Sequence, residues 1–121
     1  MSFGQILVIE DDHDYLLMLS EMLRRRFKVK VLTASNVDAA EQLLEKMDFD
    51  MVISDIQMPG RDGIEVIRIL LRLNKSLPLI FFTASDISQR TLDRHGYPCV
   101  VVNKKDHRDL MQIASNFLPG P

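Results

Sequence analysis

Acidic, hydroxyl and amine side chains follow four separate apolar segments of this 121-residue chain, each at the point where the segment ends. They are Glu10, Asp11 and Asp12 after residues 5–9, Asp55 after 50–54, Thr83 at the end of 78–83, and Asn103, Lys104 and Lys105 after 99–102. Taken singly, an Asp beyond a strand most often caps a helix, and a Lys there is most often solvated. Together they would form a reactive site only if the fold placed the four segment ends side by side.

The chemistry of such a site would depend on its carboxylates. Carboxylates held close together raise one another's pKa, which is unfavourable unless a cation compensates. Oxygen ligands without His or Cys favour a hard ion such as Mg²⁺, and a Lys and a Thr hydroxyl can hold phosphoryl oxygens. Asp55 needs no general base to act as a nucleophile, because an unperturbed Asp has a pKa of about 3.9. The combination predicts phosphoryl transfer onto a carboxylate.

The segments around these residues predict alternating strands and helices. Five apolar segments are typical of strands buried on both faces, namely residues 5–9, 29–33, 50–54, 78–83 and 99–102. Between them, apolar residues recur at helical spacing, as at Leu16, Leu19 and Leu23. Three pairs have the spacing of a helix start: Ser35 with Asp38, Asp62 with Glu65, and Asp106 with Asp109. Residues 86–95 carry the weakest helical pattern.

Strand and helix alternate five times, which predicts a parallel sheet with helices on both faces. Two doubly wound folds fit this alternation. The dinucleotide-binding fold needs glycines in the first strand–helix turn, where this chain has three acids, residues 10–12, that would repel phosphate. We therefore predict a flavodoxin-like (βα)5 α/β fold, whose five-stranded sheet has the order 2-1-3-4-5. That order places the ends of strands 1, 3, 4 and 5 at one edge.

Composition limits the partners and the compartment. The net charge of −2 gives no basic surface for nucleic acid or anionic membrane, and no apolar run approaches the roughly 18 residues of a membrane span. The first residues lack a signal-peptide pattern, and the single Cys99 excludes an internal disulfide. We expect one cytoplasmic domain over residues 1–118, with 119–121 as a tail or the start of a linker. We expect no direct binding to nucleic acid or membrane.

Four motifs, ILVIEDD, DMVISDIQMPGRDG, FFTAS and VVNKKD, resemble those of the response-regulator receiver domains of bacterial two-component signalling, the CheY-like superfamily. The resemblance covers residues 6–117. It implies that Asp55 accepts the phosphoryl group, that Thr83 is the switch hydroxyl, and that Lys104 contacts the phosphoryl group, with Lys105 as a weaker rival.

The resemblance also implies a metal and partners. Mg²⁺ or Mn²⁺ would be held by Glu10, Asp11, Asp55 and the backbone carbonyl of Gln57, which leaves Asp12 to cap the first helix. A sensor histidine kinase or phosphotransfer protein would donate the phosphoryl group. Phosphorylation would then control whether the domain binds a downstream effector protein or domain, or forms a homodimer. Such a domain catalyses its own phosphorylation and dephosphorylation but is not a turnover enzyme.

Two positions depart from the family pattern. Lys105 stands where the family usually has Pro, and Val101 stands where it commonly has Tyr or Phe, the nearest aromatic residue being Tyr97. These departures leave open a receiver fold that serves as an interaction module with an altered or absent phosphorylation switch. An aspartyl-nucleophile phosphatase is more remote, because those enzymes carry the nucleophile after the first strand in a D-x-D pattern, where this chain has EDD.

Overall fold

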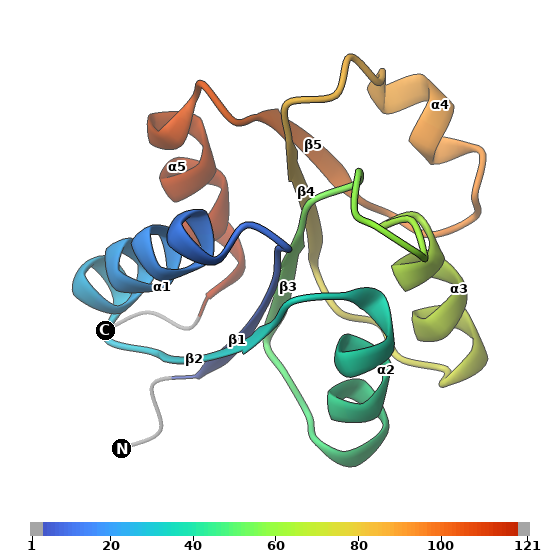
Figure 1. Cartoon of the computed structure of the whole chain (residues 1–121), viewed down its shortest axis with the longest axis horizontal. Coiled ribbons are helices and arrows are strands. Elements are labelled where there is room, and N and C mark those ends of the chain that lie inside the picture. Colours follow the sequence, from blue (N-terminus) through green and yellow to red (C-terminus); the bar gives the residue numbers. More distant parts are fainter. Residues whose placement is uncertain (1–3, 119–121) are drawn as a thin grey trace.

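A computed structural model describes residues 4–118 as a five-stranded parallel sheet covered by helices on both faces (Figure 1). The strands are β1 (Gln5–Ile9), β2 (Lys30–Ala34), β3 (Met51–Ser54), β4 (Leu79–Thr83) and β5 (Val100–Asn103). The helices are α1 (His13–Phe27), α2 (Val37–Lys46), α3 (Glu65–Arg72), α4 (Gln89–Asp93) and α5 (His107–Phe117). The strand order β2-β1-β3-β4-β5 confirms the predicted fold. The predicted tail, residues 119–121, lies outside the described residues.

The two faces of the sheet bury alternate residues of each strand. Leu7 of β1 and Phe81 of β4 belong to the core that packs against α2 and α3. The residues that follow them, Val8 and Phe82, belong to the core on the opposite face, under α1 and α5 (Figure 1). Successive side chains of a strand point to opposite faces, so an uninterrupted apolar strand can serve both cores. Within residues 4–118, no helix is long and apolar enough to cross a membrane.

Strand register determines which residues meet at the carboxyl edge of the sheet. Ile9, the last residue of β1, pairs with Ser54, the last of β3. Thr83 ends β4 and pairs with Asn103, which ends β5. Ser54 in turn pairs with Phe81, so β4 and β5 extend two residues beyond the ends of β1 and β3. The residues that follow the four strands still lie at one edge of the sheet, as predicted.

The helix starts agree with the predictions at two positions and differ at two. Asp12 caps α1 by accepting from the Tyr15 backbone N–H, and Asp106 caps α5 in the same way. The prediction that Ser35 caps α2 is wrong by one residue, because Asn36 is the cap and accepts from the Ala39 N–H. Asp62 accepts from the N–H of Ile64, and α3 begins at Glu65 without a side-chain cap. The weakly predicted fourth helix is the five-residue α4.

Candidate functional site

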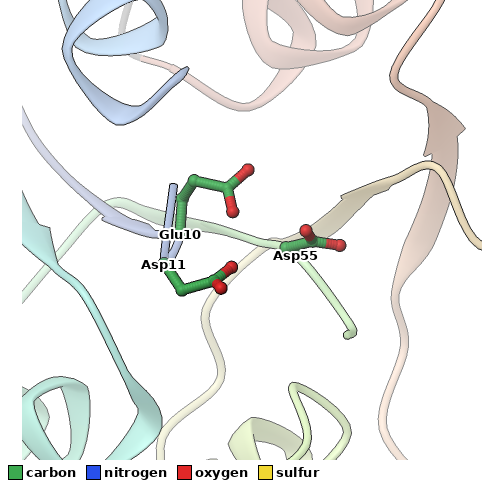
Figure 2. A group of neighbouring side chains, drawn as sticks. All are labelled: Glu10, Asp11 and Asp55. Atoms are coloured by element: carbon green, nitrogen blue, oxygen red, sulfur yellow. The ribbon is translucent and has the colours of Figure 1, made fainter. Parts of the chain in front are cut away.

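Three carboxylates meet where β1 and β3 end (Figure 2). One carboxylate oxygen from each of Glu10, Asp11 and Asp55 lies within 4.8 Å of the others. Glu10 and Asp55 are buried, with 3% and 8% of their surface exposed, whereas Asp11 is exposed. The fold therefore concentrates negative charge at this edge of the sheet, with Asp11 as the carboxylate that is open to solvent.

Backbone hydrogen bonds fix the orientation of Asp55. Its N–H donates to the carbonyl of Ile9 at 3.0 Å, which holds the residue beside the end of β1. The Ile56 N–H donates to Asp55 Oδ1 at 2.7 Å, and the Ser54 hydroxyl donates to the Asp55 carbonyl at 2.7 Å. One carboxylate oxygen is thus held by the main chain, and Oδ2 remains for another partner.

That partner is Lys104, which follows β5. Its ammonium donates to Asp55 Oδ2 at 2.8 Å and also to Glu10 Oε1. The Lys104 side chain is only 18% exposed, so the two ion pairs are largely shielded from bulk water and are weakened little by salt. The ammonium acts as the counter-ion of two buried carboxylates, which would otherwise repel each other at this distance. Lys105, the weaker rival for this role, has an exposed side chain.

The ion pairs perturb the pKa values of both Glu10 and Lys104. Burial raises the pKa of Glu10, and this effect outweighs the opposing hydrogen bond and charge of Lys104. Burial by itself would lower the pKa of Lys104, but its hydrogen bonds to Asp55 and Glu10 and the charges of both acids raise it overall. Lys104 is therefore a stable cation at neutral pH, whereas Glu10 takes up a proton more readily than an exposed carboxyl group.

Gln57 and Thr83, the remaining predicted site residues, both follow Asp55 in the sequence. Thr83 is buried at the end of β4, where its Oγ1 accepts from the Ser85 N–H at 3.0 Å. Its carbonyl accepts from the Lys104 N–H at 3.0 Å, which ties the end of β4 to the residue after β5. Gln57 lies in the loop after β3 with an exposed side chain. The expected roles of Thr83 and Gln57 depend on a bound group and stay predictions.

A divalent cation fits this set of donors. The carboxylates are hard oxygen ligands, and the ligands of one octahedral Mg²⁺ lie about 3 to 4 Å apart because each is about 2.1 Å from the ion. Oxygens that already lie within 4.8 Å of one another need little movement to reach that arrangement. The exposure of Asp11 leaves one side open for the waters that Mg²⁺ retains.

The structure shows the backbone contacts at the two positions that depart from the family pattern. Every peptide bond among residues 4–118 is trans, and the N–H of Lys105, a donor that proline lacks, donates to Asn103 Oδ1 at 2.8 Å. Beside Val101, the Gln89 side chain of α4 accepts from the Val101 N–H at 3.0 Å and donates to the carbonyl of Cys99 at 2.6 Å. Gln89 thus pairs with the free backbone edge of β5 as a neighbouring strand would.

Tyr97 is not a substitute for the missing aromatic residue on β5. It is buried, and its hydroxyl bonds to both the N–H and the carbonyl of Leu77, just before β4 begins. This position is at the amino edge of the sheet, opposite the carboxylates. A hollow of about 450 Å³ lies at the same edge, lined by Tyr97, Leu77 and Phe117 among others. It has no acidic residue in its lining, so it takes no part in the site.

Two further residues shape the site and were not predicted from the sequence as members of it. A Cβ atom at Gly63 would lie 2.0 Å from the Asp55 carbonyl oxygen, so only glycine permits the loop after β3 to fold back this closely. The ring of Tyr15 lies beneath Lys104, whose Nζ is 4.4 Å from the ring centroid. The sequence carries no local signal for this contact, because Tyr15 and Lys104 are 89 residues apart.

Comparisons with known proteins agree with this geometry. The family model described as the response regulator receiver domain matches residues 6–115. The transcriptional regulatory protein ZraR of Klebsiella oxytoca is 35% identical over 79 residues, which are 65% of this chain and 18% of that protein. The transcriptional regulatory protein YrkP of Bacillus subtilis is 40% identical over 90 residues, which are 74% of this chain and 36% of that protein. The chain thus spans about a fifth to a third of the length of these relatives.

Solved structures give the same fold. Response regulator protein TrrA of Thermotoga maritima superposes with a TM-score of 0.84 and 27% identity, covering 95% of this chain and 99% of that one. Chemotaxis protein CheY4 of Vibrio cholerae has a TM-score of 0.83 at 21% identity, covering 97% of this chain and all of that one, and supports the fold alone. Since the family model spans most of the sequence and the sheet order and acidic site agree with it, the chain belongs to the response regulator receiver domain family.

Proposed function

We propose that Asp55 accepts a phosphoryl group from a sensor histidine kinase or a phosphotransfer protein. The observation that carries this proposal is the Asp55 carboxylate itself, nearly buried and placed between two acids, Glu10 and Asp11, and the ammonium of Lys104. The TrrA structure that this chain resembles is a complex with Mg²⁺ and BeF. An isolated structural carboxylate would need neither the two neighbouring acids nor a half-buried lysine.

Glu10, Asp11, Asp55 and the Gln57 carbonyl would hold Mg²⁺ or Mn²⁺. When bound, the cation supplies positive charge against the phosphoryl oxygens. Asp55 provides the nucleophile: one of its carboxylate oxygens bonds to phosphorus as the bond between phosphorus and the donor's histidine nitrogen breaks. The electron pair of that bond leaves with the imidazole, and the product on this chain is an aspartyl phosphate.

Lys104 and Thr83 would then contact the new phosphoryl group. Lys104 already donates to the Asp55 carboxylate, so its ammonium needs to move only a short way to reach oxygens attached there. The Thr83 hydroxyl oxygen accepts from the Ser85 N–H, which leaves the hydroxyl proton free to donate to a phosphoryl oxygen. Hydrolysis by water at phosphorus would restore the carboxylate and release inorganic phosphate.

The added charge would shift an equilibrium between two surface conformations. This shift would control whether the domain binds an effector protein or domain, or associates with itself.

We propose that the signalling unit is residues 1–118, that 119–121 form a tail or the start of a linker, and that the domain works in the cytoplasm. The other hypothesis, an interaction module without phosphorylation, is not favoured, because the three carboxylates come together as phosphorylation requires.

The test is labelling with the small phosphodonor acetyl phosphate, read by intact mass as the addition of one phosphoryl group. We expect labelling of the wild type with Mg²⁺ and none after chelation. Asp11→Asn should weaken the response to Mg²⁺, and Asp14→Asn, an equal loss of charge at an exposed position three residues along, should label like the wild type. Equal labelling of wild type and Asp55→Asn would overturn the proposal.

A further inference from the structure

The face of the Tyr15 ring supports the ammonium of Lys104. Nζ lies 4.4 Å from the ring centroid, within the range of a cation–π interaction. The same ammonium donates to Asp55 and to Glu10, so it is bordered by two carboxylates and one aromatic face. The ring attracts the charge without presenting an oxygen acceptor to it, which leaves the N–H donors of Lys104 available for oxygens.

Contacts from three elements hold Tyr15 in this position. Its backbone N–H donates to the cap residue Asp12 at 3.1 Å, which fixes it in the first turn of α1. Its hydroxyl contacts the carbonyl of Lys104 at 3.4 Å and Nε2 of His107, on α5, at 3.2 Å. Its ring packs against Phe82 of β4 with the centroids 6.2 Å apart. The ring is therefore placed independently of the Lys104 side chain that it contacts.

We propose that Tyr15 is a positioning residue for Lys104, holding its ammonium at Asp55 through the face of the aromatic ring. A lysine side chain is long and flexible, and two carboxylates compete for its charge. The ring reduces the positions open to the ammonium and keeps it on the side where an Asp55 phosphoryl group would add oxygens. This inference rests on the proposed phosphorylation of Asp55 for its functional consequence, but the positioning itself can be measured without it.

The first measurement is made on the unphosphorylated protein by NMR. Ring currents from Tyr15 should move the Lys104 ε-methylene proton signals upfield, and the side chain should be ordered. Tyr15→Phe, which keeps the ring and loses the hydroxyl, should preserve both signatures. Tyr15→Leu should remove the shift and increase side-chain motion, and Tyr15→Met serves in its place if the Leu variant does not fold. Random-coil Lys104 signals in the wild type would overturn the inference.

The second measurement is the rate of labelling by acetyl phosphate. We expect Tyr15→Leu to slow labelling on the order of fivefold, the effect of losing a partly exposed cation–π contact, with Tyr15→Phe within about twofold of the wild type. Phe27→Leu, at the far end of the same helix beside Arg26, is the matched control and should have no effect. When Lys104 is already replaced by Met, adding Tyr15→Leu should not slow labelling any further.

The outcomes separate the two proposals. A wild type that is not labelled, with the ring-current shift present, would refute phosphorylation and leave the positioning of Lys104 intact. A wild type that is labelled, with Tyr15→Leu equally fast, would refute the role of Tyr15. If Tyr15→Leu slowed labelling by the same factor with and without Lys104, Tyr15 would act through the fold in general, which also overturns the inference.

Discussion

Replacing Lys104 with Met should destabilise the fold at neutral pH. The substitution removes the ammonium that pairs with Asp55 at 2.8 Å and with Glu10, and leaves two buried carboxylates without a cation. Removing one partner of a buried ion pair costs about 3 to 5 kcal/mol. Because the Lys104 side chain is 18% exposed and water can partly replace it, we take the lower end, about 3 kcal/mol.

The assay is urea unfolding followed by circular dichroism. With an m value of about 2 kcal/mol/M, the midpoint should fall by about 1.5 M urea relative to the wild type. Lys105→Met is the matched control, since it removes the same charge from an exposed neighbouring side chain, and it should cost less than about 0.5 kcal/mol. Mg²⁺ should recover part of the loss in Lys104→Met, because a divalent cation can replace the ammonium between the carboxylates.

The loss should also depend on pH. Burial already raises the pKa of Glu10 in the folded protein, and the charge of Lys104 opposes that rise, so the substitution should raise it further. An acid whose pKa is higher in the folded than in the unfolded protein destabilises the fold at any pH above its folded pKa. This loss of stability disappears as the pH falls below the unfolded pKa of a glutamate, about 4.3. The difference in free energy of unfolding between Lys104→Met and the wild type should therefore narrow from pH 7 toward pH 4. A difference that does not change with pH, or a Lys105→Met control that loses as much stability as Lys104→Met, would refute this reasoning.

Two further changes test how the site and the helices are built. Gly63→Ala should lower the free energy of unfolding, measured in urea, by at least about 2 kcal/mol, because the added Cβ would meet the Asp55 carbonyl. Gly60→Ala should lower it by only about 1 kcal/mol, because Gly60 has open space around it and only its φ of +84° is unfavourable for alanine. Equal losses in the two variants would contradict the close approach of Gly63 to Asp55. Asn36→Ala should lower the free energy of unfolding by about 1 kcal/mol in thermal or urea unfolding, because Asn36 is the cap of α2, and Ser35→Ala should lower it much less. A larger loss in Ser35→Ala than in Asn36→Ala would support Ser35 as the cap.

The strands and their order could be predicted because the signals for them are local and strong. Every residue of β3 is buried, and its apolar run is bounded by Asp50 and Asp55, so the predicted segment 50–54 differs from the observed strand by one residue. The acidic site followed from the same pattern, because residues after parallel strands share one edge. The strand order itself came from the type of fold that the alternation favours.

The details that were missed depend on contacts between distant residues. Ser35 and Asn36 are both good caps, and the choice between them is decided by tertiary packing, since Val37 and Ala40 must point into the core. Tyr15 and Lys104 are 89 residues apart in the sequence, and their contact exists only after α1 and β5 are placed against the sheet. No local pattern indicates that pairing.

The measurement that tests the central claim most directly is identification of the residue that carries the phosphoryl group. The protein would be treated with acetyl phosphate and Mg²⁺ and then with borohydride, which reduces an aspartyl phosphate to homoserine, and the modified peptide would be sequenced by mass spectrometry. We predict homoserine at position 55 in the wild type, in an amount that depends on Mg²⁺. Homoserine at another acidic position, or none at position 55 under any of these conditions, would contradict the proposal that Asp55 is the phosphoryl acceptor.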